Sequence, residues 1–128
     1  MTDARTTQRS ERGGLARRDG RRGEVLAALL LMAKGYRILG FRLAATQGEI
    51  DILAIRRGVL AVVEVKRRTT LENALEAVHA DQRDRLRRAA AAIAAGRPSL
   101  KGAVIRLDLI ALAPGRLPRH IPDAWRGS

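Results

Sequence analysis

The chain has 128 residues, a length that predicts one domain able to bury its own hydrophobic core. Its formal net charge of +12 favours a polyanionic partner, nucleic acid first, although an arginine-rich chain also reflects genome composition. It contains no cysteine, which excludes disulfide frameworks and thiolate metal sites. The longest apolar run, residues 25–33, is shorter than the roughly 20 residues that a bilayer requires, so we expect a soluble, cytoplasmic protein without a membrane partner.

The first half of the chain predicts a basic arm, one helix and three strands. Residues 1–20 are polar, arginine-rich and without periodicity, which is typical of a disordered segment. A helix is expected over residues 21–34, ended by glycine. Strand-type runs follow at 36–43, 49–55 and 59–66, and short links between them indicate an antiparallel meander.

The second half predicts a helical region, one more strand and an irregular tail. Residues 71–95 are helical in pattern, and the alanine-rich part from residue 81 is the stronger segment. The run at 103–112 is a last strand, expected to join the sheet in parallel through a helical crossover. The domain therefore spans 21–113, followed by a tail at 114–128, and its order is α-β-β-β-α-β with a mixed sheet and helices on one or both faces.

Charged residues cluster at one end of the hairpin formed by the second and third strands. Strict alternation places Asp51 with Leu53 on one face of the second strand, and Ile50 with Ile52 on the other. If the turn at Arg56–Gly58 has an even number of residues, Asp51 lies opposite Glu64 and Glu49 lies opposite Lys66. Two facing carboxylates repel each other unless a cation lies between them, and all-oxygen ligands favour Mg²⁺ or Mn²⁺.

Two interpretations of this cluster are open. Lys66 projects from the same face as Glu64, where its ammonium could hold the attacking water or stabilise charge on a phosphate. The group would then hydrolyse phosphodiester bonds. Alternatively, the charges form a solvated ion-pair cluster at a strand end, and an odd-numbered turn would favour this because the two faces would no longer match.

Several motifs resemble a known family at this point. Residues 48–54 read GEIDILA and residues 62–68 read VVEVKRR, a pairing similar to the PD-(D/E)xK nuclease superfamily with its restriction-endonuclease-like fold. More closely, with KGYRIL at 34–39, QRDRLRRAA at 82–90 and RLDLIAL at 106–112, the chain resembles the YraN family of bacterial proteins. The resemblance spans about residues 22–112.

The resemblance implies roles for individual residues. Asp51 and Glu64 would be metal ligands together with the Val65 carbonyl, Lys66 would be the catalytic lysine, and Glu24 would assist beside the metal. Weaker expectations concern nucleic-acid contacts, made by a polar residue of the second helix and by nearby arginines: Gln82, Arg67, Arg68, Arg83 and Arg87.

The chain departs from the family pattern at a few places near these motifs. Ile50 replaces the superfamily's proline, Asp81 replaces a lysine, and Phe41–Arg42 replace an Arg-Asn pair, which affects expected substrate contacts more than the metal set. The two histidines, His79 and His120, have no partner at metal-ligand spacing and are expected on the surface.

Three functions are compatible with these observations. The leading one is a Mg²⁺- or Mn²⁺-dependent endonuclease acting on nucleic acid, with DNA as the first choice. The second is a non-catalytic nucleic-acid-binding protein with a nuclease-like fold, and the third is an interaction protein for an acidic partner. The scarcity of aromatic residues, 2% of the chain, disfavours stacking of single-stranded bases and so favours duplex or branched substrates. The oligomeric state is open, with a homodimer as one option.

Overall fold

The computed structural model describes residues 21–45 and 48–126, so the expected basic arm at 1–20 lies outside the described residues. A helix at residues 21–33, called helix 21–33 below, comes first. The remaining elements are five strands, two α-helices and one short 3₁₀-helix: β1 Arg37–Ala45, β2 Gly48–Arg56, β3 Val59–Arg67, α2 Leu71–Glu76, α3 Ala80–Ala95, η1 Pro98–Leu100, β4 Val104–Leu112 and β5 Arg119–Ile121. No helix in these described ranges is long and apolar enough to span a membrane.

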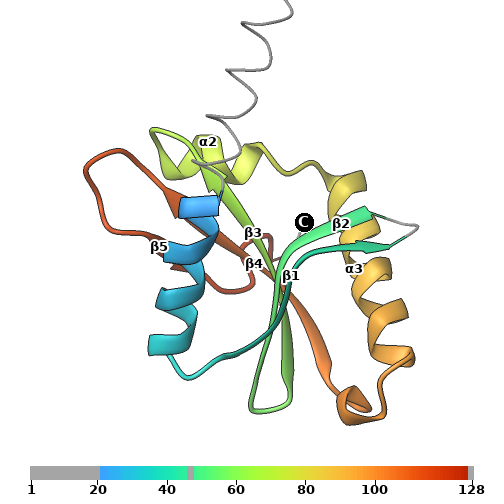
Figure 1. Ribbon diagram of the computed structural model, residues 1–128. Coiled ribbons are helices and arrows are strands. Elements are labelled where there is room, and N and C mark those ends of the chain that lie inside the picture. The colour runs from blue at the N-terminus through green and yellow to red at the C-terminus, as the bar shows by residue number, and fades with distance from the viewer. Residues whose placement is uncertain (1–20, 46–47, 127–128) are drawn as a thin grey trace, which may run out of the picture.

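The strands form one mixed sheet in the spatial order β1-β2-β3-β4-β5 (Figure 1). Strands β1, β2 and β3 pair antiparallel, β4 runs parallel to β3, and β5 pairs antiparallel with β4. The α2–α3 segment forms the crossover that a parallel β3–β4 pair requires. The predicted α-β-β-β-α-β order and the parallel placement of the strand expected at 103–112, which is β4, are therefore confirmed.

Helices cover both faces of this sheet, which decides between the two arrangements that the sequence allowed (Figure 1). Helix 21–33 packs Ala27 and Leu31 against Ile52 and Val63 in one apolar cluster. On the other face, α3 packs with β2 and β3 in a second cluster, whose members include Leu53, Leu60, Val62, Leu86 and Ala90. Strands β2 and β3 lie in the interior of the sheet, and residues on both of their faces are buried because helices cover both sides.

The β2–β3 turn has two residues, as the even-numbered alternative required. Arg56 pairs with Val59, which leaves Arg57 and Gly58 as the turn. Their φ angles of 49° and 77° are both positive, which is the geometry of a type I′ hairpin. The even-numbered turn is thereby confirmed, and the observed pairing ends at Ile52 and Val63, one residue before Asp51 and Glu64.

One expected face assignment in β2 is wrong. Strict alternation placed Ile50 with Ile52, but Ile50 packs in the second cluster, on the face of Leu53. The alternation breaks at Asp51, whose side chain accepts a hydrogen bond from the backbone N–H of Val65 in β3. The strand thus changes its facing at the residue that carries the charge.

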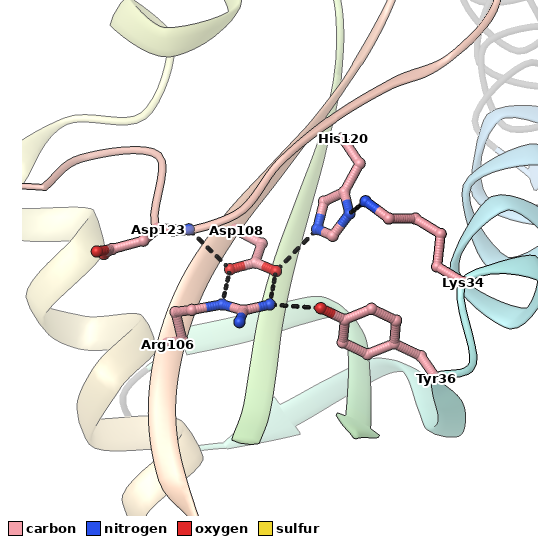
Figure 2. Close-up of polar contacts among 6 residues, drawn as sticks. All are labelled: Lys34, Tyr36, Arg106, Asp108, His120 and Asp123. Carbon is pink, nitrogen blue, oxygen red and sulfur yellow. Dashed lines mark hydrogen bonds and ion pairs between the residues drawn. The ribbon is translucent and has the colours of Figure 1, made fainter. Parts of the chain in front are cut away.

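The tail beyond Pro114, which we expected to be irregular, contains β5 and is attached to the domain by a buried polar network (Figure 2). Asp108 is fully buried and accepts hydrogen bonds from Arg106, from His120 Nε2 and from the backbone N–H of Asp123. Burial alone would raise the pKa of Asp108, but these hydrogen bonds more than offset it and lower the pKa.

The expectation that His120 lies on the surface is wrong. Its side chain is only 2% exposed, and its second ring nitrogen contacts Lys34 at the end of helix 21–33 (Figure 2). Tyr36 closes the network by accepting a hydrogen bond from Arg106. The network connects β4, β5 and the corner between helix 21–33 and β1, so a buried charge holds the tail in place.

Candidate functional site

The β2–β3 pairing ends where the charged residues begin. The last paired residues on this side are Ile52 and Val63, and beyond them Asp51 Oδ2 accepts a hydrogen bond of 2.9 Å from the Val65 N–H. The Asp51 carboxylate here takes the place of a backbone carbonyl of β2 as the acceptor for a β3 N–H group. The two strands therefore separate beyond Ile52 and Val63 and leave an opening. The apolar part of the hairpin forms the rigid support on which the carboxylates are mounted.

Glu64 lies in this opening although it is only 2% exposed. Its Oε1 atom is buried without a hydrogen-bond partner among the described residues. Burial, followed by the negative charge of Asp51, raises the pKa of Glu64 to about 8, while the nearby charge of Lys66 acts in the opposite direction. Burial also raises the pKa of Asp51. Asp51 and Glu64, called the acidic pair below, are two carboxyl groups that lack enough positive charge.

The acidic pair lines a cavity of about 400 Å³, called the acidic cavity below. Lys66 shares this lining, as the sequence predicted, and so does Gln82 from α3. The full lining comprises Gly48, Glu49, Asp51, Glu64, Lys66, Gln82, Arg85 and Leu86. Acids, an amine, an amide and a guanidinium therefore converge on one hollow between the opened hairpin and α3.

Asp51 and Lys66 also line a second cavity of about 190 Å³, on the side of helix 21–33. Glu24 belongs to this lining, so it lies near Asp51, as the resemblance implied. The carboxylate of Glu24 is occupied, however, because Arg42 Nε donates to both of its oxygens at 2.9 and 3.0 Å. Sequence reasoning recorded Arg42 only as a departure from the family pattern.

The arginines expected to contact nucleic acid lie on different parts of the surface. Arg67 lines the second cavity, whereas Arg68 lies on another part of the surface and donates to the Arg67 carbonyl. Arg83 donates to the Val78 carbonyl and its guanidinium lies over the ring of Trp125. The structure therefore does not bring Arg68 or Arg83 into either cavity.

On α3 the cavity-lining arginine is Arg85. Arg87 lies 3.5 Å from Asp84 on the exposed side of the helix. Arg85 comes three residues after Gln82, and this spacing places both on one helical face. Starting from Gln82, the spacing could have identified Arg85 in advance.

The donor chemistry of the acidic pair fits a hard divalent cation. The unpartnered oxygen of Glu64 and the raised pKa of both acids are what a site short of positive charge shows. No group of three or more His, Cys, Asp or Glu side chains in the described part of the chain could hold a metal ion. The remaining ligands would have to be backbone carbonyl and water oxygens, which is the usual surrounding of Mg²⁺.

Fold and site together define an α/β protein whose mixed sheet opens between β2 and β3 onto a cavity lined by two buried carboxylates. The chain belongs to the uncharacterised protein family UPF0102, whose family model matches residues 23–112. This family corresponds to the YraN family that the motifs resemble.

Three relatives illustrate the similarity. The chain is 71% identical over 121 residues to a UPF0102 protein of Caulobacter sp. (strain K31), covering 94% of this chain and 87% of that protein. It is 67% identical over 120 residues to a UPF0102 protein of Caulobacter vibrioides (strain NA1000 / CB15N), with 94% and 96% covered. A UPF0102 protein of Parvibaculum lavamentivorans is 43% identical over 132 residues, with 98% and 99% covered.

Proposed function

We propose that this protein is a Mg²⁺- or Mn²⁺-dependent endonuclease that hydrolyses phosphodiester bonds of nucleic acid, with DNA as the first substrate to test. The observation that carries the proposal is the convergence of two buried carboxylates with Lys66 in one cavity of a chain whose net charge is +12. The resemblance of the GEID and VEVK motifs to the PD-(D/E)xK superfamily supports it.

The acidic pair would hold the cation, with the Val65 carbonyl as a further ligand. The chemistry that such a cation supplies is polarisation of a phosphoryl oxygen and a lowered pKa of bound water. The hydrogen bond from Val65 N–H to Asp51 holds one carboxylate in place before any ligand arrives. Since burial penalises the ionised form of Glu64, a cation that binds there replaces a proton.

Lys66 would act on the reacting groups themselves. Its side chain lines both cavities, so its ammonium can donate to the attacking water or to a non-bridging phosphate oxygen. A positive group beside the phosphate stabilises the charge that develops in the transition state. Gln82 and Arg85 face the same hollow from α3 and would bind phosphate oxygens of the substrate.

The test is cleavage of duplex, branched and single-stranded DNA with Mg²⁺ or Mn²⁺, compared with the same reactions in EDTA. Asp51→Ala and Lys66→Ala should each lower the rate by at least about 100-fold, the usual effect of losing a group that stabilises the transition state. Matched controls are Asp84→Asn and Lys101→Ala, because both residues are exposed.

The outcomes separate the candidate functions. Metal-dependent cleavage that is lost in both site variants and kept in both controls supports the proposal. Salt-sensitive DNA binding without cleavage of any of these substrates would instead indicate a non-catalytic nucleic-acid-binding protein. Absence of DNA binding even at low salt would favour an acidic protein partner.

A further inference from the structure

The backbone of Arg42 is strained beside the candidate site. Its φ angle is 49°, although it is a non-glycine residue within β1. The flanking pairs, Phe41 with Ile52 and Leu43 with Ile50, place Arg42 across from Asp51. Residues with side chains rarely adopt this conformation, and glycine or asparagine would adopt it at lower cost. Such strain next to a functional cavity suggests that the side chain has a use there.

The side chain of Arg42 is held from one edge only. Glu24 of helix 21–33 accepts from Arg42 Nε with both of its carboxylate oxygens. The described residues offer no hydrogen-bond partner to the two terminal nitrogens of Arg42, which carry four of the five guanidinium N–H groups. The Arg42 side chain is 37% exposed, whereas that of Glu24 is 15% exposed. Glu24 is thus the more buried member of the ion pair, and no described residue occupies the terminal nitrogens of Arg42, which a ligand can therefore reach.

Arg42 lies beside Asp51, and the charges around it reflect that position. The hydrogen bond and charge of Glu24 raise the pKa of Arg42, and the charges of Glu49 and Asp51 contribute in the same direction. An arginine whose terminal nitrogens are not occupied by any described residue matches the geometry of a phosphate group, which it can bind with two parallel N–H bonds.

We propose that Arg42 binds a backbone phosphate of nucleic acid adjacent to the phosphate that is hydrolysed, and that Glu24 is a positioning residue that holds Arg42. This inference rests on the proposed function, and it gives Glu24 a different role from the one that the resemblance implied. In this role Glu24 acts on the substrate through the guanidinium and not through the cation. The competing explanation is that the Glu24–Arg42 ion pair only ties helix 21–33 to β1.

Arg42→Asn is the main test variant, because asparagine removes the guanidinium and tolerates the positive φ angle. The structure provides a matched control in Arg57→Asn. Arg57 is exposed, has the same φ angle of 49°, and lies in the β2–β3 turn, at the end of the hairpin opposite to Asp51. Both variants remove one positive charge and relieve the same backbone conformation, so they differ in location and in the ion pair that Arg42 makes with Glu24.

The measurement is binding of a fluorescently labelled DNA duplex in EDTA, by anisotropy, over a range of salt concentrations. Arg42→Asn should weaken binding by about tenfold and reduce the slope of log K against log salt by about 0.9, the value for one phosphate contact. Arg57→Asn should leave the slope at the wild-type value. Thermal unfolding followed by Trp125 fluorescence checks that each variant is folded, and Arg42→Lys provides a second variant that keeps the charge but loses the planar fork.

A double-mutant cycle tests the role of Glu24. If Glu24 acts through Arg42, Glu24→Gln should weaken duplex binding in the wild-type background and have no further effect in Arg42→Asn. Equal effects of Glu24→Gln in both backgrounds would overturn the positioning role. A purely structural ion pair would lower the thermal stability of the variants while leaving the salt slope unchanged.

The results also separate this inference from the proposed hydrolysis. A reduced slope in Arg42→Asn with no cleavage by the wild-type protein leaves the phosphate contact standing and removes the enzymatic proposal. Cleavage by the wild-type protein with identical slopes for Arg42→Asn and Arg57→Asn overturns the phosphate contact alone. Absence of duplex binding by the wild-type protein overturns the phosphate contact, while the cleavage assay on the three DNA substrates decides the enzymatic proposal separately.

Discussion

Replacing Glu64 with glutamine should stabilise the metal-free protein at alkaline pH. Glu64 is 2% exposed, one of its oxygens has no partner among the described residues, and its pKa is raised from 4.5 to about 8. Between these two pH values the folded state binds more protons than the unfolded state. The free energy of unfolding should therefore fall as pH rises through this window, and the penalty is fully present above about pH 8.

The size of the effect follows from the same pKa. At about 1.4 kcal/mol per pH unit, the rise corresponds to roughly 5 kcal/mol as an upper value. Asp51 shares the penalty because the two acids titrate together, so we expect Glu64→Gln to gain about 2–4 kcal/mol at pH 9 and little at pH 5. Glutamine has nearly the same volume and cannot ionise, so the packing around Glu64 is preserved.

The assay is urea unfolding in EDTA at pH 5, 7 and 9, followed by the fluorescence of Trp125. Glu76→Gln is the control, because Glu76 is an exposed residue at the end of α2. If the free energy of unfolding depends on pH identically in wild type and Glu64→Gln, or if Glu64→Gln is less stable at pH 9, the ionised Glu64 carboxylate does not destabilise the folded state. Excess Mg²⁺ should make the wild type more stable than Glu64→Gln, since the carboxylate of Glu64 binds the cation and the amide that replaces it does not.

Three further predictions follow from the same structure. Binding of Mg²⁺ to the acidic pair should release close to one proton, so the Kd for Mg²⁺ should fall by up to about tenfold for each unit that pH rises below pH 8. Calorimetry in two buffers counts the released proton, and a pH-independent Kd would contradict this prediction. Asp108→Asn should lower the free energy of unfolding in urea by about 3 kcal/mol at pH 7, because it leaves Arg106 without its charged partner. The pKa of Asp108 is lowered, so its stabilisation is present above about pH 4 and is lost as pH falls below that value. An unchanged unfolding midpoint at pH 7 would count against the network. Arg85→Ala should raise KM for DNA cleavage several-fold while Arg87→Ala changes it little, and equal effects would show that the cavity lining does not decide phosphate binding.

The hairpin was predictable because its signals are local. Two apolar runs on either side of Arg56–Gly58 predict a hairpin, although the sequence leaves the number of turn residues open; the two-residue turn at Arg57–Gly58 determines the register. This register carries Asp51 and Glu64 to the end of the paired region, where both line the acidic cavity. The parallel placement of β4 was predictable for the same reason, because a helix intervenes before the last strand.

Contacts between distant parts of the chain were not predictable. His120 has no local sign of burial, and its partners Lys34 and Asp108 are 86 and 12 residues away. The positive φ of Arg42 is likewise invisible in the sequence, since arginine is not a residue that favours that conformation. The reversed facing of Ile50 occurs next to Asp51, whose side chain accepts a hydrogen bond from the β3 backbone, and a pattern of alternating residues does not encode such a contact.

The most direct test of the central claim is a crystal structure of the protein with Mn²⁺, using the anomalous signal of the metal. One anomalous density peak is expected between the Asp51 and Glu64 carboxylates, about 2.0–2.2 Å from an oxygen of each and at a similar distance from the Val65 carbonyl oxygen. The peak should be absent from Glu64→Gln crystals grown under the same conditions. A wild-type map without a peak at the acidic pair, at Mn²⁺ concentrations that support binding in solution, would contradict the claim.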